Sequence, residues 1–449
     1  MLRYFVITLL CLILTSARGE SGSEIWRTPL RGYDLLYDPV EDIFYAGSAT
    51  FFQDDPAASI HRLNGATGKL IGDPIAIGAC GDGTNVCSFV GKFAGYYNFD
   101  GSLKYIILTA ISAGANNAFA LYETATNSIL WTYNITQEEA ANVDPPSHAE
   151  PGASFSPDGS HVFVLIPTND GIVNYAFKID GEYLFKIIDH SGITASPDSK
   201  SIYTANRCGV DQIHIDTMEK ISSWEEPECN LDIHDRPTVD SEGNVYVLNN
   251  PTTVMSLGLI KLGSNLTEGP LWMTTTPPPF DTSSFWFSPV LNKDESIVAV
   301  TIDGGVSYRP LIGLDPSDGT SLWNTTNLFF PAIHSTVYSE SKQAFYTTAG
   351  EIEVGGYVSG YDETTGSSIV TPSGLKLVYD FAIVSDERMG VILLDGTEGG
   401  NAVILYNTPS IPTTTNTPTA APSSGAFKFE VMEGIGMATI GALMVSCFY

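Results

Sequence analysis

The chain has few basic residues. Lys and Arg together number 21 against 51 Asp and Glu, which gives the 449 residues a formal net charge of −30. A chain this acidic is repelled by the phosphate backbone of nucleic acids and by anionic membrane surfaces. We therefore expect no nucleic-acid partner. The charge favours a cationic ligand, a divalent metal or a basic protein, if it serves more than solubility.

The short motifs of common enzymes are also missing. The sequence has no Gly-x-Ser-x-Gly, no His-Glu-x-x-His, no phosphate-binding P-loop and no EF-hand loop. Neighbouring carboxylates such as Glu225-Glu226 fit a solvated loop better than a glycosidase pair. The sequence therefore names no catalytic residue, and we predict no cofactor.

Cysteine is scarce, with six in the chain, and Cys11 and Cys447 lie near its two ends. The four between them are Cys80, Cys87, Cys208 and Cys229. An even number in an oxidising compartment predicts two disulfides, and four cysteines allow three pairings. We favour the short-range pairs Cys80–Cys87 and Cys208–Cys229. Zinc is the alternative, but the four include no Cys-x-x-Cys pair.

Residues 1–19 have the pattern of a secretory signal peptide. Arg3 is followed by the apolar residues 4–14, and Ala17-Arg-Gly19 is a small-x-small cleavage site. The apolar run is too short to span a bilayer. We expect the chain to enter the secretory pathway and to lie on the extracellular side of the plasma membrane.

The other end of the chain predicts a tether. Residues 408–424 form a Pro/Thr/Ser-rich tract that cannot pack a core, so we expect an extended stalk. Residues 425–449 end in an apolar tail without Lys or Arg after it, which fits a GPI-attachment signal with Ser423 or Ser424 as the attachment site. A single-pass membrane segment is the alternative.

Between these segments, residues 24–407 repeat one unit. Its clearest copy is residues 311–323, which read as a strand, an Asp/Gly turn and a second strand that ends in Trp323. Eight Pro-Asp-Gly-like turns, from residues 37–44 to residues 384–391, each lead into an alternating strand. They lie about 40 to 60 residues apart, and four strands with their turns need roughly 40 to 50. The repeat predicts an all-β, eight-bladed β-propeller, with seven blades as the alternative.

The eighth copy lacks its outermost strand. In each blade we name the strands A to D from the ring centre outward, and strand D carries the Trp. After the C strand expected at residues 401–406 no D strand follows, but Ile25-Trp-Arg27 near the start has the same form as Leu322-Trp-Asn324. We predict that this N-terminal strand completes the last blade and closes the ring.

The unit Leu314-Asp-Pro-Ser-Asp-Gly-Thr-Ser-Leu-Trp323, echoed at residues 361–366 and 63–68, resembles the repeat of the quinoprotein alcohol dehydrogenase-like (PQQ-like) propellers. Enzymes of that superfamily bind pyrroloquinoline quinone and calcium in the central funnel, and several carry a disulfide between adjacent cysteines. This sequence has no adjacent Cys pair. The resemblance therefore implies a non-enzymatic binding or scaffold member, and PQQ or a divalent metal is expected only in the enzymatic alternative.

Strand polarity places the B–C and D–A loops on one face, at the mouth of the funnel, and both predicted disulfides fall there. Counting back about six residues from each A–B turn gives a set of side chains at the same mouth. They are Lys92, His148, His190, His234, Trp286, His334 and Tyr379. They fit a mouth that binds a polar ligand or a metal, and equally strand-start residues that bond neighbouring loops. The Trp residues of the D strands are explained by packing between blades.

Three Asn-x-Ser/Thr sequons predict glycans on the rim, at Asn134, Asn265 and Asn324. Together these features predict a secreted, glycosylated, membrane-tethered recognition or scaffold module, whose partner is an extracellular protein, a glycan or a small molecule. The alternative is an extracellular enzyme, a quinone-dependent oxidoreductase or a metal-assisted hydrolase, with its site in the funnel. A purely structural coat component would have the same sequence features.

Overall fold

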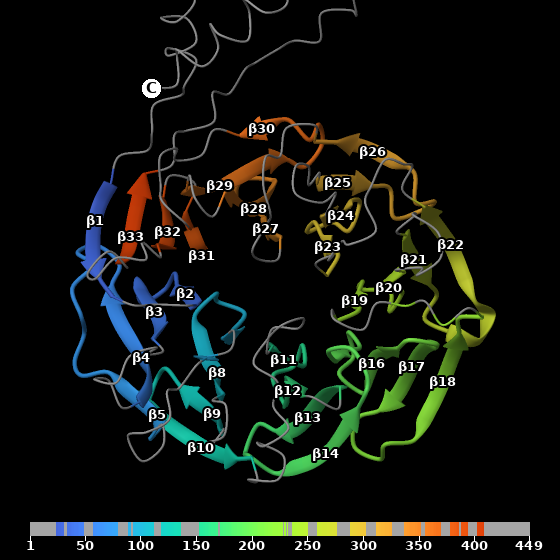
Figure 1. Ribbon diagram of the computed structural model, residues 1–449, viewed down its shortest axis with the longest axis horizontal. Helices are drawn as coiled ribbons and strands as arrows, with labels where there is room; N and C mark the ends of the chain where they lie inside the picture. Colours follow the sequence, from blue (N-terminus) through green and yellow to red (C-terminus); the bar gives the residue numbers. More distant parts are fainter. Residues whose placement is uncertain are drawn as a thin grey trace, which may run out of the picture. The chain divides into compact units, whose positions relative to one another are not determined.

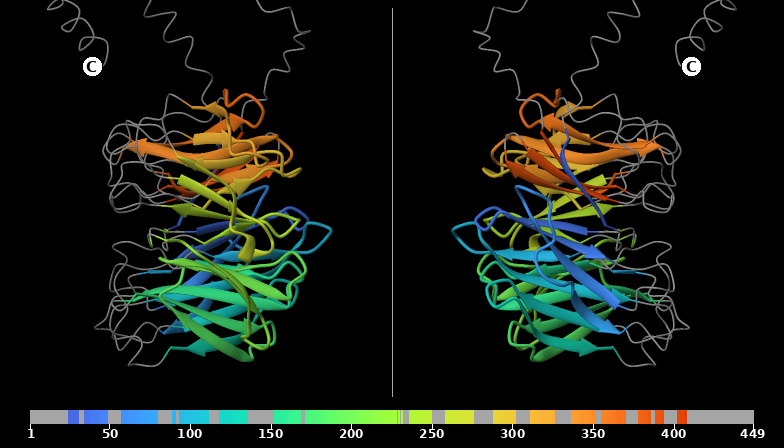
Figure 2. Two further views of the ribbon diagram at one scale, coloured as in Figure 1. Left: turned by 90° about the vertical axis from the view of Figure 1, so that its right-hand side faces the viewer. Right: turned by 90° about the vertical axis from the view of Figure 1, so that its left-hand side faces the viewer.

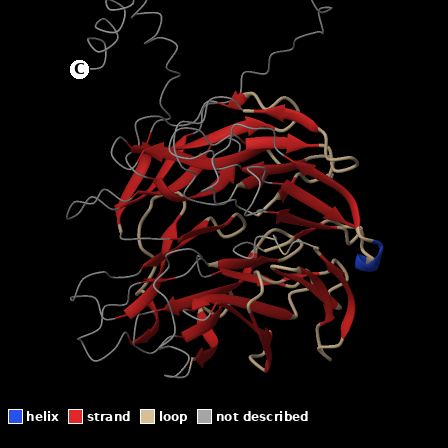
Figure 3. Ribbon diagram, turned by 45° about the vertical axis from the view of Figure 1, so that its right-hand side comes forward, coloured by secondary structure: helices blue, strands red, loops and turns tan. Residues whose placement is uncertain are grey.

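Short strands joined by turns make up nearly all of the structure, a computed structural model. It describes residues 24–30, 34–48, 57–79, 89–90, 93–111, 118–135, 152–168, 171–227, 229, 231, 236–249, 258–275, 288–301, 311–325, 336–351, 355–369, 378–385, 388–393 and 402–407. Within these residues the single helix is the 3-10 turn η1 (Leu266–Glu268), which lies at the rim (Figure 3). No helix in this part of the chain is long and apolar enough to cross a membrane.

The strands form eight antiparallel sheets arranged as the blades of a ring (Figure 1). In side view the strands run across the thickness of the ring (Figure 2). Blade 1 consists of β2 (Asp34–Asp38), β3 (Ile43–Ser48), β4 (Ala57–Asn64) and β5 (Ile75–Ala79), and blade 2 of β6 (Phe89–Val90), β7 (Ala94–Tyr97), β8 (Leu103–Ile111), β9 (Ala118–Glu123) and β10 (Ser128–Asn134). Blade 3 consists of β11 (Gly152–Phe155), β12 (His161–Thr168), β13 (Gly171–Lys178) and β14 (Tyr183–Ile188), and blade 4 of β15 (Thr194–Ala195), β16 (Ser201–Asn206), β17 (Gly209–His214) and β18 (Lys220–Glu225).

The second half of the ring repeats the arrangement. Blade 5 consists of β19 (Thr238–Val239), β20 (Val245–Asn249), β21 (Gly258–Leu262) and β22 (Pro270–Thr275), and blade 6 of β23 (Val290–Leu291), β24 (Val298–Thr301), β25 (Leu311–Leu314) and β26 (Ser321–Asn324). Blade 7 consists of β27 (Val337–Ser339), β28 (Ala344–Glu351), β29 (Gly355–Asp362) and β30 (Ser368–Ile369), and blade 8 of β31 (Val378–Ser385), β32 (Arg388–Leu393), β33 (Ala402–Asn407) and β1 (Glu24–Pro29). The eight-bladed prediction is confirmed, and the seven-bladed alternative is wrong.

Blade 8 is completed from the other end of the chain, as predicted. Strand β1 pairs antiparallel with β33, with Trp26 opposite Leu405 and Thr28 opposite Val403. The sheet order β1-β33-β32-β31 therefore joins the first described strand to the last three. This closure leaves no blade with an unfilled outer position, so both ends of the propeller are held by strand pairing.

The core lies between neighbouring blades. One cluster joins Tyr246 and Leu259 of blade 5 to Val298 and Ile312 of blade 6, and similar clusters fill other interfaces. The B and C strands are buried along nearly their whole length, as in β9 and β21, because each blade packs on a neighbour on both faces. Fully buried β-branched and aromatic side chains give the ring the large apolar burial that holds it together.

A tryptophan on strand D links each of four blades to the next. Its indole Nε1 donates a hydrogen bond to a backbone carbonyl oxygen in the following C–D turn, at 2.6–2.9 Å. The four pairs are Trp26 to Gly65, Trp131 to Ile179, Trp272 to Pro316 and Trp323 to Glu363. The indole ring of Trp323 also covers a turn glycine of the next blade. A Cβ on Gly366 would lie 2.7 Å from Trp323 Cε3, and the φ of Gly366 is +63°. Only glycine fits both the backbone angle and the space.

A β-bulge precedes each of these tryptophans. In blade 6, Trp323 pairs with Gly313 and Ser321 with Leu314, so Leu322 is the extra residue. The same irregularity falls at Ile25, Leu130 and Leu271. A bulge bends and twists its strand, which turns the indole toward the next blade and leaves the bulged residue facing outward. Leu271 is accordingly 56% exposed.

The A–B turns explain the recurring Asp/Gly clusters. In each of blades 1 to 7 one turn residue has a positive φ. These residues are Asp42, Gly101, Gly159, Ser199, Gly243, Glu295 and Gln343. In blade 3 the Asp158 carboxylate accepts hydrogen bonds from the Ser156 hydroxyl and the Ser160 backbone N–H, which closes the turn. The acidic residues of these turns thus have a local structural role.

Candidate functional site

The chain direction gives the ring two different faces. We call the side with the A–B and C–D turns, such as residues 157–160 and 316–319, the turn face. We call the side with the B–C turns and D–A connections, such as residues 207–208 and 189–193, the loop face. Loops that share a face can combine into one site, so the loop face is where residues of several blades meet.

One of the predicted mouth residues has a described side chain. His190 lies between β14 and β15, in the D–A connection from blade 3 to blade 4. Tyr379 lies in β31, but its side chain is outside the described part. Lys92, His148, His234, Trp286 and His334 also lie outside the described residues, as do Cys80 and Cys87. The structure therefore places His190 on the loop face and leaves the rest of the set as a prediction.

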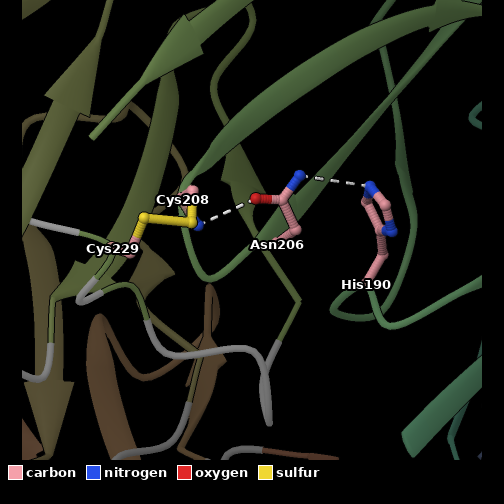
Figure 4. Close-up of a disulfide and its surroundings, with 4 residues drawn as sticks. All are labelled: His190, Asn206, Cys208 and Cys229. Atoms are coloured by element: carbon pink, nitrogen blue, oxygen red, sulfur yellow. Dashed lines mark hydrogen bonds between the residues drawn. A yellow bond between two sulfur atoms is a disulfide. The ribbon is translucent and has the colours of Figure 1, made fainter. Parts of the chain in front are cut away.

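The second predicted disulfide is present on the same face. Cys208 lies in the two-residue turn between β16 and β17, and Cys229 follows β18 (Figure 4). Backbone hydrogen bonds run beside the bridge, from the Glu226 N–H to the Cys208 carbonyl (2.7 Å) and from the Leu231 N–H to the Arg207 carbonyl (3.1 Å). A bridge between cysteines 21 residues apart stabilises the fold by about 3 kcal/mol in the chain-entropy picture.

Asn206 connects this disulfide to His190. Its Oδ1 accepts a hydrogen bond from the Cys208 N–H (2.8 Å), and its Nδ2 lies 3.4 Å from His190 Nε2 (Figure 4). The other ring nitrogen, Nδ1, contacts the Ile188 carbonyl at 2.9 Å. Because a carbonyl only accepts, Nδ1 carries a proton. Both nitrogens of His190 are therefore engaged within the protein.

An acidic and a basic residue of blade 4 complete the cluster. Asp211 Oδ2 lies 3.6 Å from His190 Nε2, and its Oδ1 lies 2.8 Å from Lys220 Nζ. Burial raises the pKa of Asp211, but the hydrogen bonds from His190 and Lys220 outweigh it, so the pKa is lowered. Burial lowers the pKa of His190, but Asp211 and the Ile188 carbonyl outweigh it, so that pKa is raised. Both groups thus favour their charged forms.

Arg236 brings a third blade into the cluster. A Cβ on Gly192, two residues after His190, would lie 2.8 Å from Arg236 Cβ, so the two backbones are in close contact. The Arg236 guanidinium reaches past blade 4 and donates from Nη1 to the Ala153 carbonyl on β11, at 3.2 Å. Arg236 and Arg207 are both exposed. The loop face of blades 3 to 5 therefore presents cationic side chains on a chain that is strongly acidic overall.

His190 is held at both ring nitrogens, and among the described residues no hydroxyl or thiol group hydrogen-bonds to its imidazole. Within the described residues no group of three or more His, Cys, Asp or Glu is placed to hold a metal ion. Arg207 presents an exposed guanidinium group on this face.

The sequence missed most of this cluster. His190 was predicted from its distance to the A–B turn, but its partner Asp211 comes from β17 and Asn206 from the end of β16. Strand pairing sets these positions, and Asp211 reads in the sequence as an ordinary polar residue of an alternating strand. The one usable signal was the pair Asn206 and Cys208 at a two-residue turn.

The three sequons lie where the fold predicts. Asn134 and Asn324 are the last residues of the outer strands β10 and β26, and Asn265 precedes η1 in a C–D turn. All three are exposed. In the turn, the Asn265 Oδ1 accepts a hydrogen bond from the Thr267 hydroxyl at 2.8 Å, so the Asn and Thr side chains of this sequon contact each other.

Comparisons with known proteins identify a fold but no family. No protein-family model matches the chain, and no curated protein matches it. Among solved structures, Sqt1 of Saccharomyces cerevisiae is 12% identical in sequence, with a TM-score of 0.56. The match covers 87% of this chain and 100% of the Sqt1 chain. The Dos1 propeller is 11% identical over 87% of this chain and 95% of its own, with a TM-score of 0.54. The chain therefore has the β-propeller fold, with distant structural similarity to Sqt1 and to the Dos1 propeller.

Proposed function

We propose that this protein is a secreted, membrane-tethered recognition module that binds an extracellular partner through its loop face. The observation that supports this best is the Cys208–Cys229 disulfide, which fixes a B–C turn to a D–A connection on that face. Disulfides persist in oxidising compartments, and this one stabilises the loops that would form a binding surface. The signal-like residues 1–19 and the three exposed sequons agree with the same address.

The closing blade supports one orientation for such a tether. Strand β33 is the C strand of blade 8, so its last residue, Asn407, lies at the turn-face end of the blade. A stalk over residues 408–424 and an anchor over residues 425–449 would then begin on the turn face. A tether that starts there leaves the loop end of blade 8 without the covalent attachment, which suits a surface that meets partners.

The tryptophan links support membership of the PQQ-like propeller superfamily, as a non-enzymatic scaffold. Each linked unit has an apolar residue before the Trp, a turn glycine in the following blade and a carbonyl that accepts from the indole. This pattern is what the repeat residues 314–323 imply. No contact of the described residues requires PQQ or calcium, and the proposed binding does not depend on either.

Two charge-reversal variants of blade 4 test the proposed face. Arg207→Glu changes an exposed residue of the loop face, and Lys200→Glu changes an exposed residue of the turn face in the same blade. The purified chain is applied to arrays of extracellular proteins and glycans. We expect Arg207→Glu to abolish binding to any hit and Lys200→Glu to leave it within about twofold.

Two results would contradict the proposal. If Lys200→Glu abolished binding and Arg207→Glu did not, the turn face would be the binding surface. If the purified chain carried a stoichiometric metal or a quinone absorbance, an enzymatic role in the funnel would replace the recognition role. Release of the chain from intact cells by a phosphatidylinositol-specific phospholipase checks the tether separately.

A further inference from the structure

The Cys208–Cys229 disulfide lies at the surface of the loop face. Both cysteines are exposed, and Cys208 lies at the tip of the turn between β16 and β17. Thiol–disulfide exchange requires a thiolate to reach one sulfur, so exposure is the first condition for it. Buried structural bridges fail this condition.

Cys229 lies in a tight turn. Its φ is +56°, in the left-handed region that a residue with a Cβ adopts at a cost. Its N–H donates to the Glu226 carbonyl (3.2 Å), which closes the turn that carries the bridge.

The surrounding hydrogen bonds keep the two cysteines near each other after the bridge opens. The Glu226 N–H donates to the Cys208 carbonyl, and the Leu231 N–H donates to the Arg207 carbonyl. Two further strand pairs, Gly209 with Glu225 and Val210 with Trp224, hold β17 to β18 just beside them. The thiols would remain within reach of one another, so oxidation can reform the same bridge.

Asn206 lies between the bridge and His190 (Figure 4). Because the Cys208 N–H must be bonded to an oxygen, the orientation of the Asn206 amide is fixed, and its Nδ2–H points at His190 Nε2. That donor favours an unprotonated Nε2. Asp211, 3.6 Å from the same nitrogen, favours a protonated one. The two neighbours therefore compete for one ring nitrogen.

Other charged groups among the described residues lie near this pair. Lys220 on β18 lies against Asp211, Asp189 precedes His190 in its own segment, and Arg236 packs on Gly192. Asp211 favours a charged imidazole and Lys220 opposes it. Asn206 is bonded to the backbone of Cys208 itself, so opening of the bridge reaches it most directly.

We propose that Cys208–Cys229 is a site of reversible thiol–disulfide exchange, and that opening it releases Asn206 from His190 and leaves the imidazole to Asp211. The reductant is an external thiol, either a small molecule or a cysteine of another protein. Its thiolate attacks one sulfur, which forms a mixed disulfide and expels the other cysteine as a thiolate. A second external thiolate attacks the mixed disulfide at the external sulfur. This step releases an external disulfide and leaves both cysteines of the chain reduced.

Reduction of the folded chain tests the exchange. The full-length protein is equilibrated with reduced and oxidised glutathione at a series of ratios, alkylated, and analysed by mass spectrometry at the peptides of Cys208 and Cys229. We expect both to be alkylated under reducing ratios while tryptophan fluorescence stays native, and the bridge to return under oxidising ratios. Amide exchange at residues 206–209 should become roughly tenfold faster, with β12 and β13 unchanged. A bridge that resists reduction until the strands unfold, or whose reduction unfolds the propeller, would overturn the proposal.

The link to His190 has its own readout. The chain is labelled with ¹³C at histidine, and the imidazole of His190 is titrated by NMR with the bridge closed, reduced, or removed by Cys208→Ser/Cys229→Ser. We expect the pKa of His190 to rise when the bridge opens, because Asp211 no longer competes with Asn206. In Asn206→Ala the bridge should have no effect on that pKa. An equal shift with and without Asn206, or none at all in the parent chain, would contradict the coupling.

Discussion

The indole Nε1 of Trp272 donates a hydrogen bond to the carbonyl oxygen of Pro316, 2.9 Å away in the next blade. The bulged Leu271 beside it points outward and is 56% exposed. Two neighbouring apolar residues thus have opposite roles, because the bulge between them turns one side chain toward the adjoining blade. The ring is held by this repeated geometry rather than by any one contact.

The Trp272 link gives the first prediction. Trp272→Phe keeps an aromatic ring but removes the N–H, and should lower the free energy of unfolding by about 1 kcal/mol. Trp272→Ala also removes the packing and should cost about 3–5 kcal/mol. Leu271→Ser is the matched control and should change little, which urea unfolding checks. Equal effects at both positions would mean that the indole does not join the blades.

Gly366 tests the close approach of Trp323. Gly366→Ala introduces a Cβ at a φ of +63° and 2.7 Å from the indole, so overpacking adds to backbone strain. We expect a loss of about 2–4 kcal/mol. Gly101 has a similar φ of +85°, but its nearest atom would be 3.8 Å away. Gly101→Ala should therefore cost only about 1–2 kcal/mol. Thermal unfolding of the two variants separates contact from conformation, and equal losses would argue against the contact.

A buried ion pair in blade 5 also contacts blade 6. Lys261 Nζ lies 3.6 Å from Asp240 Oδ2 and donates to the Pro316 carbonyl at 3.1 Å, and both side chains are almost fully buried. Lys261→Met leaves the Asp240 carboxylate without its cation, and we expect a loss of about 3 kcal/mol in urea unfolding. The exposed pair Lys293 and Glu340 is the control, since Lys293→Met should have no measurable effect. If Lys261→Met were as stable as the parent chain, the hydrogen bonds from Asn244 and Tyr246 would be enough to stabilise the Asp240 carboxylate without the ammonium group.

The sequence predicted the ring better than the cluster on its loop face. Asp/Gly-like turns recur along the ring and a Trp lies on the outer strand of five of the eight blades, so these features identified the blades and the closing role of Trp26. Lys261 was missed because its strand, Gly-Leu-Ile-Lys-Leu, reads as one with a solvent-facing lysine, while all five residues are buried. Asp211 was missed because its contact with His190 depends on how the strands of blade 4 pair with the segment that enters the blade. Such pairing has no fixed sequence spacing, and a single sequence therefore does not show it.

The pair His190 and Asp211 predicts a pH dependence. The pKa of His190 is raised in the folded chain, so protonated His190 stabilises the fold. This stabilisation is complete below the ordinary pKa of 6.5 and is lost as the pH rises through the raised pKa. The lowered pKa of Asp211 means that its contribution is present above 3.8 and is lost as the pH falls through the lowered one. The stability difference between the parent chain and His190→Gln should therefore be largest between these two values and shrink at alkaline pH. Urea midpoints from pH 4 to 9 check this. The stability difference between the parent chain and Asp211→Asn should depend on pH in the same way. A difference that grows above pH 7 would contradict the pairing.

Hydrogen exchange of the propeller with and without a bound partner tests the assignment of the binding face most directly. If the loop face binds, protection on complex formation appears in residues 189–193, 206–209 and 226–231, while residues 157–160 and 197–200 of the turn face exchange at their free rates. Protection confined to the turn-face segments would contradict the account.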